Sequence, residues 1–167
     1  MDTTITVLIA EDNDDDALII QRAFRQNGLP RPVQIVHDGS VAIDYLAGNG
    51  IYGDRITYPF PNIVVLDLKM PRVSGFEVLQ WLNEHPDYRV IPTIVWSSSA
   101  DRRDVKHAFC IGAHAYLCKP TSYDQFVAMV GRMLAFWEDC EKPGVDPADP
   151  TCESLQSREP FSGAHFH

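Results

Sequence analysis

Five side chains that could handle a phosphoryl group follow short apolar runs of the sequence. They are Glu11 and Asp12 after the first run, and Asp67, Ser97 and Lys119 after three later ones. Three carboxylates that lie close together repel one another and need a cation. Their oxygens suit a hard divalent ion, Mg²⁺ above all, and the set holds no histidine or cysteine that would favour zinc.

The same side chains suit phosphoryl transfer. Asp67 would be the nucleophile that becomes an acyl phosphate, while Mg²⁺ neutralises the oxygens of the transferred group. Lys119 would bind one phosphoryl oxygen as a point charge, and Ser97 would donate a hydrogen bond to another. This chemistry requires all five side chains to meet in one place, which depends on the elements that carry them.

Those elements alternate between apolar runs and helical stripes. Strands are expected at 5–10, 33–36, 63–66, 91–96 and 115–118, and helices at 14–27, after a cap at Ser40, at 75–84, at 101–111 and from a cap at Ser122 to about Trp137. Strands too apolar to face water on either side predict a parallel sheet with helices on both faces, a doubly wound α/β fold. Because ligands bind beyond the carboxyl ends of such strands, the five side chains should share one rim.

Two segments lie outside this alternation. Residues 48–61 form an unusually long loop, a length typical of functional or mobile segments. After Glu141 the sequence becomes rich in proline and acidic residues. Residues 1–142 are therefore expected to form the domain, and residues 143–167 an extended C-terminal tail.

Composition limits the possible partners. The net charge of −9 argues against nucleic acid and against an anionic membrane surface, because the chain has no surplus of basic residues. No stretch approaches the roughly 18 apolar residues that span a bilayer, and no targeting segment is visible. Cys110 and Cys118 have apolar neighbours and are expected to be buried, reduced thiols. These features favour a cytoplasmic protein without disulfides.

The acidic run 11–16 allows other interpretations. A calcium-binding loop does not fit, since its sixth position would be Ala17 rather than glycine and its twelfth Ala23 rather than glutamate. We interpret residues 14–16 as a solvated first turn of a helix, where negative charge is favourable.

Four segments resemble the signature segments of two-component response-regulator receiver domains. They are LIAEDN at 8–13, VVLDLKMP at 64–71, PTIVWS at 92–97 and GAHAYLCKP at 112–120. The resemblance covers about residues 4–137. It implies a flavodoxin-like or CheY-like fold of five βα units, with a five-stranded parallel sheet in the order 2-1-3-4-5.

The resemblance also implies roles for single residues. Asp67 matches the phosphoacceptor, Asp12 the direct ligand of Mg²⁺, and Glu11 the metal partner that acts through water. The backbone carbonyl of Lys69 matches the third protein ligand, beside Asp67. Lys119 matches the lysine that binds the phosphoryl group.

Ser97 matches the switch hydroxyl and Tyr116 the switch aromatic. In such domains phosphorylation draws the hydroxyl inward and lets the aromatic ring rotate, which reshapes the fourth helix, fifth strand and fifth helix. A sensor histidine kinase would supply the phosphoryl group, and the output would be protein contact. The chain would catalyse only its own phosphorylation and dephosphorylation, so it is not expected to be an enzyme in the usual sense.

A narrower resemblance concerns the small single-domain regulators that pair with bacterial phytochrome histidine kinases. It rests on the long 48–61 segment, the DLKMP run at 67–71 and the Phe136-Trp137 pair, and it implies a phytochrome-type partner. The last helix also carries more apolar residues than the one stripe needed to cover a sheet. A homodimer through the fourth helix, fifth strand, fifth helix and C-terminal region is therefore expected.

Two other functions compete with this one. A hydrolase of the haloacid dehalogenase type also uses an aspartate at a strand end, but it would want a second acid two residues later, where Lys69 stands, and a cap domain. A receiver-fold binding module that no longer takes phosphate is the second alternative. The full set of Glu11, Asp12, Asp67, Ser97 and Lys119 argues against it.

Overall fold

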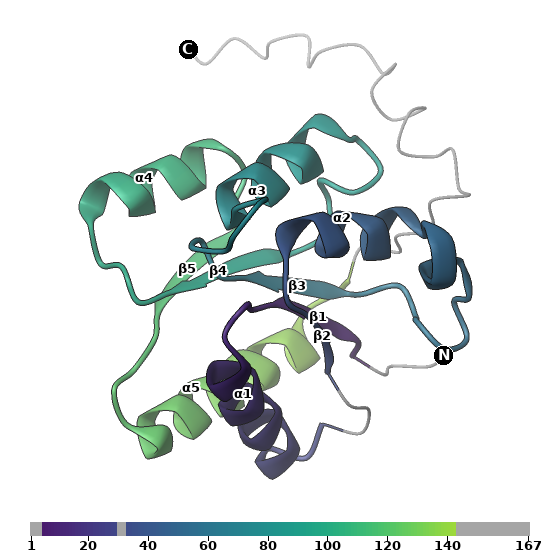
Figure 1. Ribbon diagram of the computed structural model, residues 1–167. Helices are drawn as coiled ribbons and strands as arrows, with labels where there is room; N and C mark the ends of the chain where they lie inside the picture. Colours follow the sequence, from purple (N-terminus) through teal and green to yellow (C-terminus); the bar gives the residue numbers. More distant parts are fainter. Residues whose placement is uncertain (1–4, 30–32, 143–167) are drawn as a thin grey trace, which may run out of the picture.

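A five-stranded parallel sheet lies between two layers of helices in the computed structural model, which describes residues 5–29 and 33–142 (Figure 1). The strands are β1 (Val7–Ala10), β2 (Gln34–Val36), β3 (Ile63–Leu66), β4 (Thr93–Ser97) and β5 (Ala115–Cys118). Their order is β2-β1-β3-β4-β5, and neighbouring strands are parallel. This confirms the doubly wound, CheY-like sheet that the signature segments implied.

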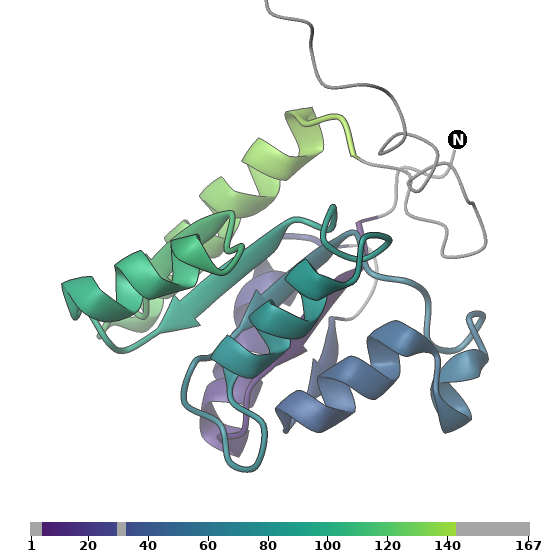
Figure 2. The ribbon, with the colours of Figure 1, turned by 90° about the horizontal axis from the view of Figure 1, so that it is seen from above.

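Within the described residues, helices cover both faces of the sheet. They are α1 (Asp14–Gln26), α2 (Gly39–Ala47), α3 (Gly75–Glu84), α4 (Arg102–Cys110), α5 (Tyr123–Asp139) and the 3-10 helix η1 (Gly50–Gly53). Helices α2, α3 and α4 lie on one face, while α1 and α5 pack against each other on the opposite face (Figure 1, Figure 2). Successive residues of a strand point to opposite faces of the sheet, and an apolar core lies on each face. Leu8 therefore packs in one core and Ile9 in the other.

Side chains cap the helices, with one difference from expectation. Ser122 caps α5 as expected, by accepting a hydrogen bond from the Gln125 N–H at 3.2 Å. The cap of α2 is Asp38 instead of Ser40, because the helix already begins at Gly39 and Ser40 lies inside its first turn. The Asp38 carboxylate accepts from the Ser40 N–H at 2.6 Å and from its hydroxyl at 2.7 Å, and the hydroxyl bond is the main cause that lowers the Asp38 pKa.

The 48–61 segment is held against α2 by aromatic rings and one guanidinium. Arg55 donates hydrogen bonds to the carbonyl oxygens of Tyr45 and Leu46, both at 2.8 Å, and so satisfies the last carbonyls of the helix. Its guanidinium also lies over the rings of Tyr45 and Phe60. The Tyr45 hydroxyl donates to the Pro59 carbonyl at 2.8 Å. The inserted segment is therefore a packed part of the domain.

Tyr45 should make the stability of the folded protein depend on pH in the alkaline range. The residue is 1% exposed, and burial raises its pKa from 10.0 to about 12. An acid whose folded pKa is raised contributes stability below the unfolded pKa and loses it as pH rises through the folded pKa. Stability should therefore fall by up to about 3 kcal/mol between those two pH values.

Tyr45→Phe should remove that alkaline loss. The variant should also lose about 1 kcal/mol at neutral pH, because the hydrogen bond to Pro59 is missing. Urea unfolding at stepped alkaline pH measures both effects. Tyr123→Phe, which changes an exposed ring on α5, is the control and should keep the alkaline loss of the wild type. If Tyr45→Phe loses as much stability at alkaline pH as the wild type does, Tyr45 is not the source of that loss.

The cysteines differ from expectation. Cys110 and Cys118 are exposed, not buried. Cys118 ends β5, an edge strand whose residues are only partly covered, and Cys110 ends α4 on its outer side. The expected tail at 143–167 lies outside the described residues. None of the helices in the described part of the chain is long and apolar enough to cross a membrane.

Candidate functional site

The carboxyl ends of β1 and β3 bring three carboxylates together. Ala10 pairs with Leu66 in the sheet, so the residues that follow, Glu11 and Asp67, emerge side by side. Together with Asp12, each can offer an oxygen within 4.8 Å of the others. The sequence placed these acids at one rim, and the structure brings them there.

Lys119 crosses to the same rim from the end of β5. Its ammonium donates hydrogen bonds to the Glu11 carboxylate at 2.6 Å and to the Asp67 carboxylate at 3.0 Å. A third bond, also of 3.0 Å, goes to Asp16 on α1. Because an ammonium has three donors, these three carboxylates use all of them.

Asp16 is the site residue that the sequence interpretation missed. We expected it to be only part of a solvated helix start, and this is wrong, since it forms an ion pair with Lys119. No local signal marked this role, because Asp16 lies beside two other acids in the first turn of α1 and its partner comes from the end of β5.

Burial and charge oppose each other at this site. Glu11 is 2% exposed, and burial raises its pKa above the usual range even though Lys119 acts to lower it. Burial acts to lower the pKa of Lys119, but the hydrogen bond and charge of Glu11, with the charge of Asp67, raise it overall. A buried carboxylate and a mostly buried ammonium therefore stabilise each other's charged forms.

The donor set fits Mg²⁺. Glu11, Asp12 and Asp67 offer only oxygen atoms, which is the ligand chemistry that Mg²⁺ prefers. Asp67 is further fixed by the Lys69 N–H, which donates to its Oδ1 at 3.2 Å. The carboxylates repel one another, and a divalent cation would relieve this repulsion.

Ser97 ends β4 and is fully buried, two residues before Ser99. Its hydroxyl oxygen accepts a hydrogen bond from the Ser99 N–H at 3.1 Å. The Ser99 carbonyl accepts from the Tyr116 hydroxyl at 2.8 Å, and the Ser99 hydroxyl donates to Asp104 of α4 at 2.7 Å. The two expected switch residues, Ser97 and Tyr116, are thus linked through Ser99.

Gly75 sets the path of the chain after Asp67. A Cβ atom at this position would overlap the backbone carbonyl of Asp67, so α3 can start here only at a glycine. The Gly75 N–H donates to the Leu68 carbonyl at 3.1 Å. Ser74 and Glu77 then close a capping box at the helix start.

Gly75→Ala should destabilise the protein by about 3 kcal/mol, because backbone must move to admit the methyl group. Urea unfolding measures the loss. Gly28→Ala is the matched control: its φ of +77° disfavours alanine, but no atom lies within 4 Å of the new Cβ. That variant should lose about 1 kcal/mol. Equal losses of stability in the two variants would show that backbone conformation, and not the contact of the new methyl group with the Asp67 carbonyl, causes the loss in Gly75→Ala.

The sheet order, together with a rim of acids and one lysine, is typical of α/β domains that take a phosphoryl group onto an aspartate. The sequence model for the response regulator receiver domain matches residues 7–131. The chain belongs to this family. Receiver domains act in two-component systems, where they accept a phosphoryl group in a Mg²⁺-dependent reaction.

Several relatives share most of the chain. The probable methanogenesis regulatory protein FilR2 of Methanothrix harundinacea is 32% identical over 78% of this chain and 82% of its own length. The response regulator RPA3017 in red light signaling of R. palustris has a TM-score of 0.79 and 34% identity, covering 83% of this chain and 98% of that one. The phosphorylated cyanobacterial phytochrome response regulator RcpA has a TM-score of 0.77 and 29% identity, covering 84% and 99%.

Proposed function

We propose that this chain is a single-domain response regulator that accepts a phosphoryl group from a sensor histidine kinase onto Asp67. The observation that carries the proposal is the meeting of Glu11, Asp12 and Asp67 with Lys119 at the carboxyl rim. Glu11, Asp12, Asp67 and the Lys69 carbonyl would hold Mg²⁺. A bound Mg²⁺ would neutralise charge on the transferred phosphoryl group.

The side chains of this chain then have distinct tasks. An Asp67 oxygen attacks the phosphorus of a phosphohistidine, so that a P–O bond forms, the P–N bond breaks and the imidazole leaves. Lys119 turns one N–H to a phosphoryl oxygen, and Ser97 donates its hydroxyl to another. Water later releases phosphate and restores Asp67. The chain catalyses these two reactions on itself and turns over no separate substrate.

The switch region supports a route from the site to the surface. When the Ser97 hydroxyl turns to the phosphoryl group, the Ser99 N–H loses its partner. Ser99 holds both Tyr116 and Asp104, so the ring on β5 and the start of α4 respond together. Phosphorylation then shifts the balance between two conformations of this face.

A small phosphodonor tests the chemistry. The wild-type protein is incubated with acetyl phosphate and Mg²⁺, and its intact mass is measured with and without EDTA. We expect one phosphoryl adduct, absent with EDTA and removed by hydroxylamine as an acyl phosphate would be. No adduct would favour the binding module. Turnover of general phosphate esters would favour the hydrolase.

The partner we propose is a phytochrome-type histidine kinase in the cytoplasm. Similarity to RPA3017 and to RcpA supports this choice, because their names place both in light or phytochrome signalling. Autophosphorylated kinases offer a direct test. A bacterial phytochrome kinase should transfer its phosphoryl group to this chain faster than a histidine kinase with an unrelated sensor. Equal rates would remove the phytochrome assignment and leave the receiver function intact.

We also propose a homodimer through α5 and β5. A groove of about 320 Å³ lies between these elements and is lined mostly by apolar side chains, including Leu117, Met129 and Trp137. Phe136 at its border is 62% exposed. A second copy would cover these side chains. Analytical ultracentrifugation before and after phosphorylation measures the state, and a monomer in both conditions would contradict this part of the proposal.

A further inference from the structure

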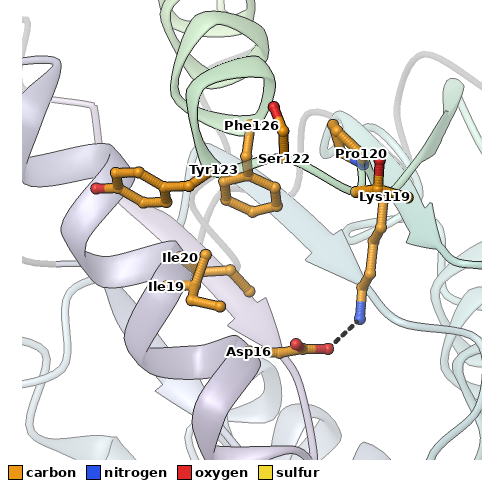
Figure 3. Close-up of a pocket in the computed structure, with 9 residues that line it drawn as sticks. Asp16, Ile19, Ile20, Lys119, Pro120, Ser122, Tyr123 and Phe126 are labelled. Atoms are coloured by element: carbon orange, nitrogen blue, oxygen red, sulfur yellow. Dashed lines mark hydrogen bonds and ion pairs between the residues drawn. The ribbon is translucent and has the colours of Figure 1, made fainter.

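Asp16 reaches the site from a different element than the other acids. It lies in the first turn of α1, and its carboxylate points across to the Lys119 ammonium, which arrives from the end of β5 (Figure 3). The two residues border a cavity of about 250 Å³, whose other side is lined by Ile20 and Phe126. Apolar side chains therefore flank this ion pair on one side.

The partners of Lys119 fall into two kinds. Glu11 and Asp67 belong to the three carboxylates that converge as cation ligands, and Asp16 does not belong to that set. A cation at the rim would compete with Lys119 for Glu11 and Asp67. Within the described residues, Asp16 is the carboxylate that could stay on Lys119 throughout.

We propose that Asp16 is a positioning residue for phosphoryl transfer, which anchors the Lys119 ammonium at the rim while Glu11 and Asp67 turn to the cation. One N–H of Lys119 stays on Asp16, and the two others are released from Glu11 and Asp67, so that one of them can meet a phosphoryl oxygen. The inference rests on the proposed phosphorylation of Asp67 and adds a fourth acid to its site. A charged donor that is already held in its reactive orientation before the reaction is a recognised source of rate enhancement.

A general effect of helix charge must be separated from this role. Asp14, Asp15 and Asp16 all lie in the first turn of α1, where any acid stabilises the helix. Asp15 is exposed and is not among the carboxylates that pair with Lys119 in the described residues, so Asp15→Asn removes the same charge from the same turn. Asp16→Glu keeps the charge and moves the carboxylate by one methylene group.

The first test follows adduct formation with acetyl phosphate and Mg²⁺ by intact mass. Asp16→Asn should slow phosphorylation about tenfold, the loss expected for one charged hydrogen bond. Asp15→Asn should stay within about twofold, because it changes only exposed charge, and Asp16→Glu should recover part of the rate. Equal rates for Asp16→Asn and Asp15→Asn would overturn the inference. If the wild type takes no phosphoryl group, the proposed function fails instead.

The second test needs neither metal nor phosphodonor. Thermal unfolding in EDTA is compared for Asp16→Asn alone, Lys119→Met alone and both together. With Lys119 present, Asp16→Asn should lower the melting temperature by roughly 4 °C. In the Lys119→Met background, Asp16→Asn should raise the melting temperature, because it removes a carboxylate that would repel Glu11 and Asp67. The same shift in both backgrounds would show that the ion pair does not hold Lys119.

Discussion

Asp67→Asn should abolish phosphorylation completely and leave the fold intact. The amide has the shape of the carboxylate, and its oxygen can still accept the hydrogen bond from the Lys69 N–H. An amide is a poor nucleophile and brings no negative charge to a cation, so both the acceptor and one metal ligand are lost. The variant loses the ion pair between Asp67 and Lys119 but also removes one of the carboxylates that repel one another at the rim, so its stability should stay close to that of the wild type.

Intact mass after incubation with acetyl phosphate and Mg²⁺ measures this result, and thermal unfolding checks the fold. Asp15→Asn is the matched control, because it changes an exposed aspartate of the same acidic run. It should take up phosphate about as the wild type does. An adduct on Asp67→Asn in wild-type amount would place the acceptor at another residue and contradict the site described above.

Lys119→Met should destabilise the protein in EDTA by about 3 kcal/mol at neutral pH, the loss expected when one partner of a buried ion pair is removed. Methionine fills similar space but leaves Glu11, which is 2% exposed, without its cation. Asp67 and Asp16 then repel it further. Added Mg²⁺ should restore most of the loss, because the ion supplies the missing positive charge to Glu11 and Asp67.

The same variant should show a characteristic dependence on pH. Burial already raises the Glu11 pKa above 4.5, and removal of Lys119 takes away the main cause that lowers it. A carboxyl group whose folded pKa is raised binds its proton more tightly in the folded state. The stability that Lys119→Met loses through the buried charge of Glu11 is therefore absent below pH 4.5. This loss grows as pH rises through the folded pKa of Glu11.

Urea unfolding with EDTA or Mg²⁺, at several pH values, measures both effects. Lys106→Met, on the exposed side of α4, is the control and should change stability by less than about 0.5 kcal/mol. Unchanged stability of Lys119→Met in EDTA would show that the carboxylates are already neutralised by protons or solvent. A loss that Mg²⁺ does not recover would show that Lys119 acts through packing.

The sheet and its rim were predictable from sequence for one physical reason. Apolar runs of four or five residues, such as 63–66, mark strands that are covered on both faces, and a polar residue directly after each run marks the rim. Strand order came from the resemblance, since no pattern of residues in one strand specifies its neighbours. The meeting of Glu11, Asp67 and Lys119 followed from strand ends alone.

The features that were missed depend on contacts between distant segments. Asp16 looked like an ordinary helix start because Lys119, its partner, is 103 residues away. The sequence marked 48–61 only as a long loop, typical of functional or mobile segments, because its attachment comes from Arg55 meeting the end of α2. Cys118 looked buried because its neighbours are apolar, whereas β5 is an edge strand.

The position of Ser99 has an evolutionary consequence. Within the described residues, Ser99 is hydrogen-bonded to Ser97, Tyr116 and Asp104, and not to Asp67, Glu11 or Lys119. Substitutions at Ser99 could therefore retune how strongly the output surface follows the site, without rebuilding the acids that carry out the chemistry. Paralogues built on one reaction centre could then diverge in responsiveness by changing this single connecting residue.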